Sequence, residues 1–494
     1  MKTFIVLIMA VCICSFTGCD TDEKESVIPV ILGSSLSGAY SGGWYTMLGG
    51  TGNDYAYSGQ QTADGGCIVA GYGDQDIPAL QGKAPKNPYA ASNDMLIIKL
   101  DSSGYVSWYT FLGGEGSDHA YSVQQTRDGG YIIAGSSIGG AIPSLQGKTP
   151  LIPYDGSYDM LVVKLNSSGN VSWYTFLGGG GSDVAFSVRQ TRDGGYVLTG
   201  TGGAITSLQG KSPILAHHTG GDILVIKLSS TGNVSWYTFF GTSGTDDGKS
   251  VRQTADGGYI VAGWAGAEIS SLQGVSPNNY FADDEDDMIV VKMDPSGDVA
   301  WWTYLGSTGY DHAHSVMQTS DGGYIVAGYA GANIPSLQGI PGPVNPYSGT
   351  APTMDWLVVK MDSSGDASWY TFAGSSSGEE ATSIQQTDDG GFIVAGCAYA
   401  ASTIQGVEPV IVNHTGIDGL VVRLDESGNV YGCTYLGGPG DDRITSIGQT
   451  ADGGYFVTGY SSGLISWLGG VWPLNGYSGA NDMFLVKLQV GGSM

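Results

Sequence analysis

Residues 118–135 read DHAYSVQQTRDGGYIIAG, and close copies of this phrase occur six more times along the chain of 494 residues. A fixed period of this length is the signature of a repeat architecture. We therefore expect residues shared by all copies to be scaffold, and residues that differ between copies to carry the function. The tripeptide DGG marks the copies, with spacings of 64, 65, 63, 65, 68 and 63 residues, and it begins at Asp64, Asp128, Asp193, Asp256, Asp321, Asp389 and Asp452.

Each repeat contains four runs that are typical of β-strands. In the second repeat these runs are Ala120–Thr126, Gly130–Gly135, Met160–Leu165 and Val171–Leu177, called a, b, c and d in chain order. Runs b and c are almost continuously apolar, so both of their faces must be covered, as in sheets stacked around an axis. DGG between a and b, and SSGN-type segments between c and d, supply glycine for tight turns. No helical period of useful length is present, so the sequence predicts an all-β antiparallel meander.

The two ends of the repeat region predict how the ring closes. A lone d run, Trp44–Leu48, precedes the first a run, and the last repeat ends on a c run, Met483–Leu488, with no d run after it. The N-terminal run therefore completes the last sheet and removes an exposed sheet edge. We predict a seven-bladed β-propeller of four-stranded antiparallel blades over residues 43–490, closed by an N-terminal "velcro" strand, with a short tail at 491–494.

Over residues 43–490 the chain resembles the bacterial seven-bladed β-propeller repeat family, often abbreviated SBBP. The resemblance rests on the phrase YLGGxGxDxAxS, DGGYIVAGY, IPxLQG and DMLVVKLDxSG, which recurs with variations in the repeats. It implies the same propeller fold. It implies little about activity, because propellers host many unrelated functions.

The first nineteen residues are typical of a bacterial lipoprotein signal. Lys2 gives a positive start, residues 4–16 are almost wholly apolar, and Phe16-Thr17-Gly18-Cys19 resembles a lipobox, with Cys19 as the lipidated residue. An ordinary secretory signal is the alternative, but it leaves Cys19 unexplained. Beyond the signal no apolar run is long enough to span a bilayer, so we expect contact with the membrane through the lipid alone.

Residues 20–42 would form an acidic tether between lipid and propeller. The segment 20–25, DTDEKE, resembles signals that send some bacterial lipoproteins to the cell surface. We therefore predict an outer-membrane lipoprotein that is exposed at the surface, with the periplasmic face as the alternative.

The formal net charge is −27, from 46 acidic and 19 basic residues. Such a chain repels phosphate backbones, so nucleic acid is excluded as a partner. Three cysteines would remain in the mature repeats, Cys67, Cys397 and Cys433, and an odd number is no disulfide framework. We predict that they are buried, inert thiols.

Three sets of charged residues recur in every repeat, and we interpret them as structural. Short carboxylates at loop ends can accept backbone N–H groups, and a basic residue inside a strand needs an acidic partner, such as the DGG aspartate. The acid at the start of run c is Asp94, Asp159, Asp222, Asp287, Asp355, Asp418 and Asp482. The acid between runs d and a is Asp54, Asp118, Asp183, Asp246, Asp311, Glu379 and Asp441. The basic residue of run c is Lys99, Lys164, Lys227, Lys292, Lys360, Arg423 and Lys487.

The seven insertions between runs b and c, about twenty residues each, share one side of the ring with the loops between runs d and a. We expect a ligand to bind to this side or at the central channel mouth that it surrounds. The insertions share a Leu-Gln-Gly motif, as at Leu80-Gln81-Gly82, whose leucine should tuck onto the propeller and order the loop. Exposed aromatic rings flanked by Asn and Asp suit sugars, although each ring could instead pack against its own loop. The candidate ligand-binding residues are Tyr89, Tyr154, Tyr280, Tyr347 and Tyr477, together with Trp467 and Trp472, which break the repeat pattern.

A calcium ion is the one cofactor that the sequence suggests. Residues 283–287 read DDEDD, and oxygen-rich clusters suit Ca²⁺, so Asp283, Asp284 and Asp286 are candidate ligands. The segment is not a D-x-D-x-D-G loop, and a solvated charge run is the competing interpretation.

No catalytic signature is present. His119 and His312 share a register, with His314 beside the latter, but no two histidines have metal-ligand spacing. The leading hypothesis is a non-enzymatic, lipid-anchored binding propeller that recognises an extracellular glycan or protein. One alternative is a propeller glycosidase or lyase, which requires non-repeated acids and aromatics clustered at the channel mouth. The other is a scaffold of an envelope complex.

Overall fold

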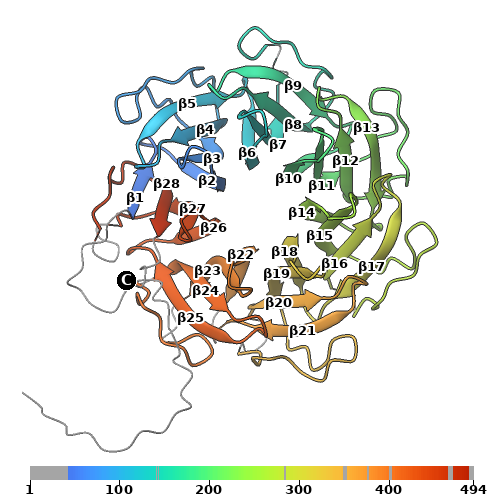
Figure 1. The fold of residues 1–494 in the computed structure, drawn as a ribbon. Coiled ribbons are helices and arrows are strands. Elements are labelled where there is room, and N and C mark those ends of the chain that lie inside the picture. The colour runs from blue at the N-terminus through green and yellow to red at the C-terminus, as the bar shows by residue number, and fades with distance from the viewer. Residues whose placement is uncertain are drawn as a thin grey trace, which may run out of the picture.

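The computed structural model describes residues 43–488, apart from 141, 143, 283–284, 349–352, 375–377, 400–402, 415 and 466–470. It shows seven four-stranded antiparallel sheets arranged as blades around a central opening, which confirms the predicted propeller (Figure 1). The signal, Cys19, the tether and the tail lie outside the described residues. Within those residues, no helix is present that could cross a membrane.

Each blade runs from an innermost strand beside the axis to an outermost strand at the rim, and neighbouring strands are consecutive in the chain. Blades 1 and 2 are β2 (Asp54–Gln61), β3 (Cys67–Gly73), β4 (Asp94–Leu100), β5 (Val106–Leu112), and β6 (Ser117–Gln125), β7 (Tyr131–Ile138), β8 (Tyr158–Leu165), β9 (Val171–Leu177). Blades 3 and 4 are β10 (Val184–Gln190), β11 (Tyr196–Gly202), β12 (Asp222–Leu228), β13 (Val234–Phe240), and β14 (Asp246–Gln253), β15 (Tyr259–Ala265), β16 (Asp287–Met293), β17 (Val299–Leu305). Blades 5 and 6 are β18 (Asp311–Gln318), β19 (Tyr324–Ala330), β20 (Asp355–Met361), β21 (Ala367–Phe372), and β22 (Glu379–Gln386), β23 (Phe392–Tyr399), β24 (Ile417–Leu424), β25 (Val430–Leu436).

Blade 7 is built from both ends of the repeat region. Its inner three strands are β26 (Asp442–Gln449), β27 (Tyr455–Ser461) and β28 (Asp482–Leu488), and β1 (Trp44–Leu48) pairs antiparallel with β28 as the outermost strand. The predicted velcro closure is therefore confirmed. The a–b and c–d turns share one side of the ring, the turn face, and the b–c and d–a connections share the other, the loop face.

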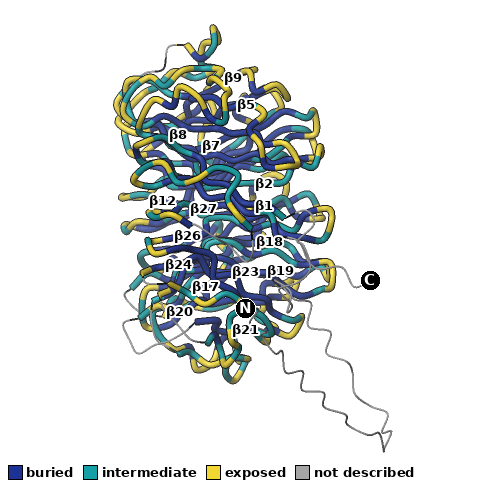
Figure 2. The backbone as a smooth tube through the Cα atoms, turned by 90° about the vertical axis from the view of Figure 1, so that its left-hand side faces the viewer, coloured by how far each residue is buried: buried dark blue, intermediate teal, exposed yellow. Residues whose placement is uncertain are grey.

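The hydrophobic core fills the spaces between adjacent blades. Strands β4, β12 and β16 are buried along their whole length, because each is covered by a neighbouring blade on both sides. Figure 2 shows the buried segments inside the ring and the exposed ones mainly at its edges. The outer strands interlock as well. Trp108 of β5 lies edge-on to Tyr131 of β7, with ring centres 5.6 Å apart, and it covers Gly169 in the c–d turn of blade 2. A Cβ on Gly169 would lie 2.8 Å from that indole, so the contact requires glycine.

The b–c insertions do not surround the channel mouth, which corrects our expectation. They run along the outer rim of the ring, where a short segment of each pairs with the outermost strand (Figure 1). In blade 1 the N–H of Lys86 donates to Tyr109 O at 2.9 Å, and the N–H of Phe111 donates to Asn87 O at 3.1 Å. The same pair of bonds recurs in all seven blades. The insertions thus cover exposed sheet edges, which would otherwise invite aggregation.

The Leu-Gln-Gly motif fixes each insertion to its blade. Leu80 is buried, as predicted, and so are its counterparts in blades 2 to 6, Leu145, Leu208, Leu272, Leu337 and Ile404. Gln81 has a φ of 47°, and its Oε1 accepts a hydrogen bond from the N–H of Val106 at the start of β5. The insertion therefore spans the height of the blade and is held at its far end.

In every blade an ion pair links a buried basic residue of strand c to a largely exposed aspartate in the turn between strands a and b. Lys164, in β8, has a side chain only 5% exposed, and its Nζ lies 3.0 Å from Oδ2 of Asp128 in the DGG turn. All seven basic residues of run c pair with the DGG aspartate of their own blade, which confirms the predicted partner. Burial alone would raise the pKa of Asp128, but hydrogen bonds from Thr126 and Lys164 lower it to about 2.

Buried carboxyl groups meet in pairs at each boundary between blades, on the loop face. Asp94 and Asp118 approach each other around Gly113, where a Cβ would lie 2.2 Å from the first and 2.7 Å from the second. Burial, together with the Asp118 charge, raises the pKa of Asp94 to about 7, and burial raises that of Asp118 to about 6. The pairs are Asp482 and Asp54, Asp94 and Asp118, Asp159 and Asp183, Asp222 and Asp246, Asp287 and Asp311, Asp355 and Glu379, and Asp418 and Asp442.

One member of this set was predicted at the wrong position. Blade 7 uses Asp442, which is buried and accepts from the N–H of Gly438, whereas Asp441 is exposed. Because two aspartates are adjacent here, the sequence did not show which of them occupies the repeated position. The remaining cysteines, Cys67, Cys397 and Cys433, are buried free thiols as predicted.

Candidate functional site

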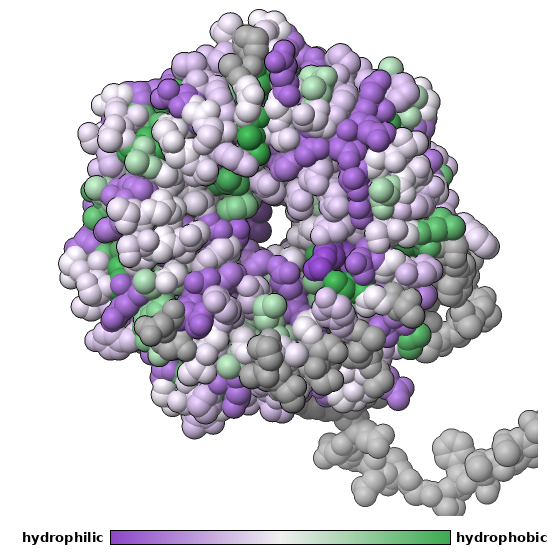
Figure 3. Space-filling view, turned by 180° about the vertical axis from the view of Figure 1, so that it is seen from behind, coloured by the Kyte–Doolittle hydropathy of each residue, from purple (hydrophilic) through white to green (hydrophobic). Residues whose placement is uncertain are grey.

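The central channel is a cavity of about 1130 Å³, lined mainly by the innermost strands of all seven blades. Figure 3 shows its opening at the middle of one face, bordered largely by hydrophilic residues. Whereas the cores between blades repeat closely, the lining of this cavity does not. It is therefore the place where the seven repeats differ inside the fold.

A β-bulge in each innermost strand creates the lining. In β6 the pairing register with β7 shifts between Ala120 and Ser122, so that Tyr121 is an extra residue without a cross-strand partner. A bulge turns such a side chain away from the alternation of the sheet. The same shift occurs in all seven blades, and every bulged residue lines the cavity.

The seven bulged residues, which we call the bulge ring, divide the channel into three sectors. They are aromatic in blades 1 to 3, basic or imidazole in blades 4 and 5, and threonine in blades 6 and 7. In blade order they are Tyr57, Tyr121, Phe186, Lys249, His314, Thr382 and Thr445.

A second ring lies three residues further along each strand, about 10 Å closer to the turn face. Glutamine is the commonest residue here, and it links neighbouring blades: Gln60 Oε1 accepts from the N–H of Gln125 at 2.9 Å. The second ring consists of Gln60, Gln124, Arg189, Arg252, Met317, Gln385 and Gly448, all of which line the cavity.

The aromatic sector of blades 1 to 3 is a continuous surface, and Tyr460 extends it into blade 7. The ring of Tyr121 lies 5.1 Å from that of Tyr57 and 5.3 Å from that of Phe186, measured between centres. Tyr55, two residues before Tyr57 in β2, contacts Tyr460 of blade 7, with ring centres 4.5 Å apart. Burial raises the pKa of Tyr57, so these phenols stay neutral and act as hydrogen-bonding, flat apolar groups.

Lys249 joins the aromatic sector to a charged cluster in blades 4 to 7. Its Nζ lies 3.3 Å from the centre of the Phe186 ring and 4.4 Å from that of Trp264, and it forms an ion pair with Asp247 at 3.1 Å. Burial lowers the pKa of this lysine, although the Asp247 charge opposes the shift. Cation–π contacts of this kind hold an ammonium group in a partly dry site.

Two histidines occupy blade 5. His312 stacks on Trp264 with ring centres 3.9 Å apart, and its Nε2 lies 3.0 Å from Asp286 Oδ2. Its Nδ1 lies 2.7 Å from the hydroxyl of Tyr329, so both ring nitrogens are engaged. His314 is in the bulge ring, and burial together with the Lys249 charge lowers its pKa to about 3. It is therefore neutral at physiological pH.

Glu380 completes the cluster at the start of blade 6. It lies 3.4 Å from His314 Nδ1 and 4.0 Å from Arg443 Nη1. Burial raises its pKa, while the charges of Arg443 and Lys249 oppose that shift. The described part of this sector thus combines a carboxyl of raised pKa, neutral imidazoles and two cations in one wall.

Four of the predicted tyrosines use their hydroxyls within their own insertions. Tyr89 donates to Asp74 O at 2.7 Å, and its ring lies edge-on to Phe111. Tyr154, Tyr347 and Tyr477 donate in the same way to Ser157, Gly331 and Ala480. In blade 4 the equivalent packing role falls to Phe281, which leaves Tyr280 67% exposed.

The other candidates lie on the rim or outside the described residues. Trp472 is 71% exposed, and Trp467 lies outside the described residues. Asp283 and Asp284 also lie outside them, and Asp286 lies against His312, with Oδ2 3.0 Å from Nε2. Among the described residues, no group of three or more His, Cys, Asp or Glu could hold a metal ion.

Sequence reasoning missed the channel residues, although a signal for them exists. In the phrase DxAxSVxQ, the second and third variable positions are the bulge ring and the second ring. Their side chains differ between repeats while Ala, Ser and Gln around them recur. The seven insertions of about twenty residues each looked like binding loops and indicated the rim instead.

No protein-family model matches the chain, and no curated protein matches it. Among solved structures it is similar to Sqt1 from Chaetomium thermophilum, with 10% identity, coverage of 91% of this chain and 98% of that chain, and a TM-score of 0.42. It is also similar to BamB from Moraxella catarrhalis (10% identity, 90% and 99% coverage, TM-score 0.36) and to YCF48 bound to D1 peptide (10%, 90% and 97%, 0.41). Likenesses this low carry no argument about function.

Proposed function

We propose that this protein is a binding propeller that holds a saccharide in its central channel. The observation that carries the proposal is the bulge ring. Seven blades that repeat their cores, turns and ion pairs present seven bulged side chains of five different kinds to one cavity. Packing does not require this variety, because the surrounding scaffold is the same in each blade.

A saccharide fits the chemistry of the lining. Sugar rings have flat apolar faces that stack on aromatic side chains, and their hydroxyls need hydrogen-bonding groups nearby. Tyr57, Tyr121 and Phe186 supply the faces, while serines, threonines and glutamines of the innermost strands supply donors and acceptors. A cavity of about 1130 Å³ is large enough for a short oligosaccharide.

The anchoring predicted from the sequence belongs to the same proposal. A lipid on Cys19 and the tether of residues 20–42 would hold the propeller at the bacterial envelope, where glycans are abundant. Protease added to intact cells tests the location. Digestion of the propeller on intact cells supports surface exposure, whereas protection until lysis supports the periplasmic face.

The binding experiment is an array of glycans and matrix proteins, probed with soluble residues 20–494 in the presence of calcium. A saturable glycan signal that is lost in Tyr57→Thr/Tyr121→Thr, and kept in Trp472→Ala, supports the channel. Threonine is the residue that blades 6 and 7 already carry in the bulge ring, so the double variant should fold. A signal lost only in Trp472→Ala would place binding on the rim and overturn the channel proposal.

An enzyme acting on glycans is the second candidate, and one specific observation favours it. Glu380, Asp247 and Asp286 are acids near the channel that the other repeats lack, and they lie among Trp264, His312 and Tyr329. Burial raises the pKa of Glu380, and a carboxyl of raised pKa suits a general acid at a catalytic site. Loss of polymer chain length after prolonged incubation, absent in Glu380→Gln, would identify this activity.

A further inference from the structure

Arg189 and Arg252 line the channel side by side in blades 3 and 4, at equivalent places in the second ring. Blades 1, 2 and 6 have glutamine at this place. Those glutamines have a structural task, since Gln124 Oε1 accepts from the N–H of Gln190, and Gln385 Oε1 accepts from that of Gln449. Replacing glutamine by arginine gives up this acceptor and adds a charge.

The two guanidinium groups have no carboxylate partner among the described residues. Arg189 Nη1 donates to Ser122 Oγ at 3.1 Å and to Val188 O at 2.7 Å, which are neutral acceptors. The Nε atoms of both arginines are buried without a hydrogen-bond partner. Burial lowers the pKa of both groups, and the charge of Arg252 adds to the effect on Arg189. Arginine nevertheless keeps its proton in proteins, so both remain cations.

The acids that line the channel do not pair with Arg189 or Arg252. Among its described lining residues five are Lys or Arg and two are Asp or Glu, in a chain whose formal net charge is −27. Of the two acids, Glu380 is engaged by His314 and Arg443, and Asp388 is exposed at the turn face. Both arginines are half-buried, and cations taken partly out of water without a counter-ion are costly, so an anion that enters the channel would lower that cost.

We propose that Arg189 and Arg252 form an oxyanion site that binds the acidic group of the channel ligand. This inference rests on the proposed function and narrows it, from saccharides in general to saccharides that carry a carboxylate, sulfate or phosphate. Paired guanidinium forks match the oxygens of such groups. Phe186 lies three residues from Arg189 on the same strand, so one sugar ring can stack on the aromatic sector while its acidic group reaches the arginines.

Calorimetric titration with inorganic sulfate tests the anion site without any saccharide. The variant is Arg189→Gln/Arg252→Gln, which restores the residue that blades 1, 2 and 6 already use and should preserve the fold. The matched control is Arg127→Ala/Lys148→Val, which removes two exposed positive charges and introduces the residues of blades 1 and 4 at those positions. Uronate-containing, sulfated and neutral oligosaccharides of equal length are then titrated into the same three proteins.

We expect sulfate to bind the wild-type protein and the control, and to bind the double variant at least ten-fold more weakly, since hydrogen bonds to charged groups are strong. Acidic oligosaccharides should likewise bind the double variant more weakly than the wild type and the control. Comparison of the uronate-containing with the sulfated oligosaccharides then shows whether the site prefers a carboxylate or a sulfate. Sulfate binding without binding of any saccharide would support the anion site and overturn the saccharide proposal. Neutral saccharides that bind as tightly as acidic ones, with no loss in the double variant, would support the saccharide proposal and overturn the anion site. Absence of sulfate binding to the wild type would also overturn it.

Discussion

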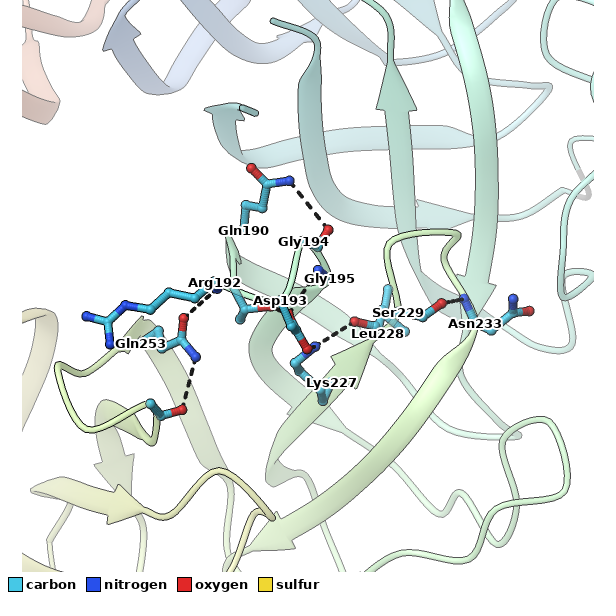
Figure 4. A network of polar contacts seen from close by, with 12 residues as sticks. Gln190, Arg192, Asp193, Gly194, Gly195, Lys227, Leu228, Ser229, Asn233 and Gln253 are labelled. Atoms are coloured by element: carbon cyan, nitrogen blue, oxygen red, sulfur yellow. Dashed lines mark hydrogen bonds and ion pairs between the residues drawn. The ribbon is translucent and has the colours of Figure 1, made fainter. Parts of the chain in front are cut away.

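Gln61 Oε1 accepts a hydrogen bond from the backbone N–H of Ala451, 390 positions further along the chain, at 2.8 Å. Equivalent glutamines make this bond at the other six blade boundaries, and Figure 4 shows Gln253 bonded to Arg192 beside the Asp193–Lys227 ion pair. The boundary that closes the ring is thus built like the boundaries within the chain. We infer that the propeller unfolds as one unit rather than from its seam.

Removal of the velcro strand should damage blade 7 specifically. Deleting residues 40–50 takes away β1, which leaves β28 as an unpaired edge strand. We expect a lower melting temperature by calorimetry and self-association in size-exclusion chromatography. An unchanged melting temperature together with a monomeric profile would contradict the assigned closure.

Loss of one partner of the ion pair inside a blade should lower the free energy of unfolding much more than loss of both partners. Asp128→Ala leaves the Lys164 ammonium buried without a counter-charge, and we expect it to lower the free energy of unfolding by about 1–3 kcal/mol, because the aspartate itself is largely exposed. Adding Lys164→Met should recover most of that loss. The measurement is a double-mutant cycle by denaturant unfolding, and two additive losses would contradict the pairing.

The paired carboxyls make stability depend on pH. Their folded pKa values, about 6 for Asp118, about 7 for Asp94 and about 8 for Asp311, lie above the unfolded value of 3.8. The folded state therefore holds extra protons, and this stabilisation is present below the unfolded pKa and lost as the pH rises through the folded values. The DGG aspartates act oppositely, since their stabilisation is lost only as the pH falls towards 2.

We accordingly expect the melting temperature to be highest near about pH 4 to 5 and to fall towards pH 9. Asp94→Asn mimics the protonated form and should remove part of that fall, by about 1 kcal/mol or more. The exposed Glu408→Gln serves as control and should leave the profile unchanged. A wild-type melting temperature that rises between pH 5 and pH 9 would refute the shared-proton interpretation.

Alanine substitutions at two glycines distinguish the energetic cost of backbone strain from that of a steric clash. Gly232 and Gly210 both have positive φ values, 84° and 74°, so alanine is strained at either position. A Cβ on Gly232 would lie 2.9 Å from the Trp173 indole, whereas nothing lies within 4 Å of one on Gly210. We expect Gly232→Ala to cost about 1–3 kcal/mol more than Gly210→Ala in denaturant unfolding. Equal losses would mean that the indole does not lock neighbouring blades.

The aromatic sector should respond to single substitutions in ligand binding without loss of stability. Phe186→Thr removes a stacking face and the cation–π partner of Lys249, and threonine occurs at this place in blades 6 and 7. We expect about ten-fold weaker binding of the array ligand and a melting temperature close to wild type. Weakened binding that accompanies partial unfolding, seen by circular dichroism, would assign Phe186 to the scaffold.

The fold could be predicted because the strands and turns of each repeat follow from local sequence, namely apolar runs separated by glycine-containing turns. The lone strand Trp44–Leu48 even fixed the closure. The position of the site could not be read in the same way. Simple alternation does not reveal the bulge at Tyr121, since a bulge depends on pairing with β7. The insertions looked like binding loops, because their pairing with outer strands, as at Lys86 and Tyr109, is a tertiary contact.

The bulge also allows ligand preference to change without a change in the stability of the fold, although in most proteins the two change together. A residue such as Thr382 lies in a strand whose neighbours are fixed by packing, yet its own side chain has left the alternation of the sheet and borders the channel, where its hydroxyl donates to Ala395 O and Ile444 O. Each blade therefore offers one position where a substitution alters ligand preference at little cost to folding. Seven such positions, each set independently, would let a single scaffold be retuned to new ligands, in nature or in the laboratory, by exchanging residues that the repeats already tolerate.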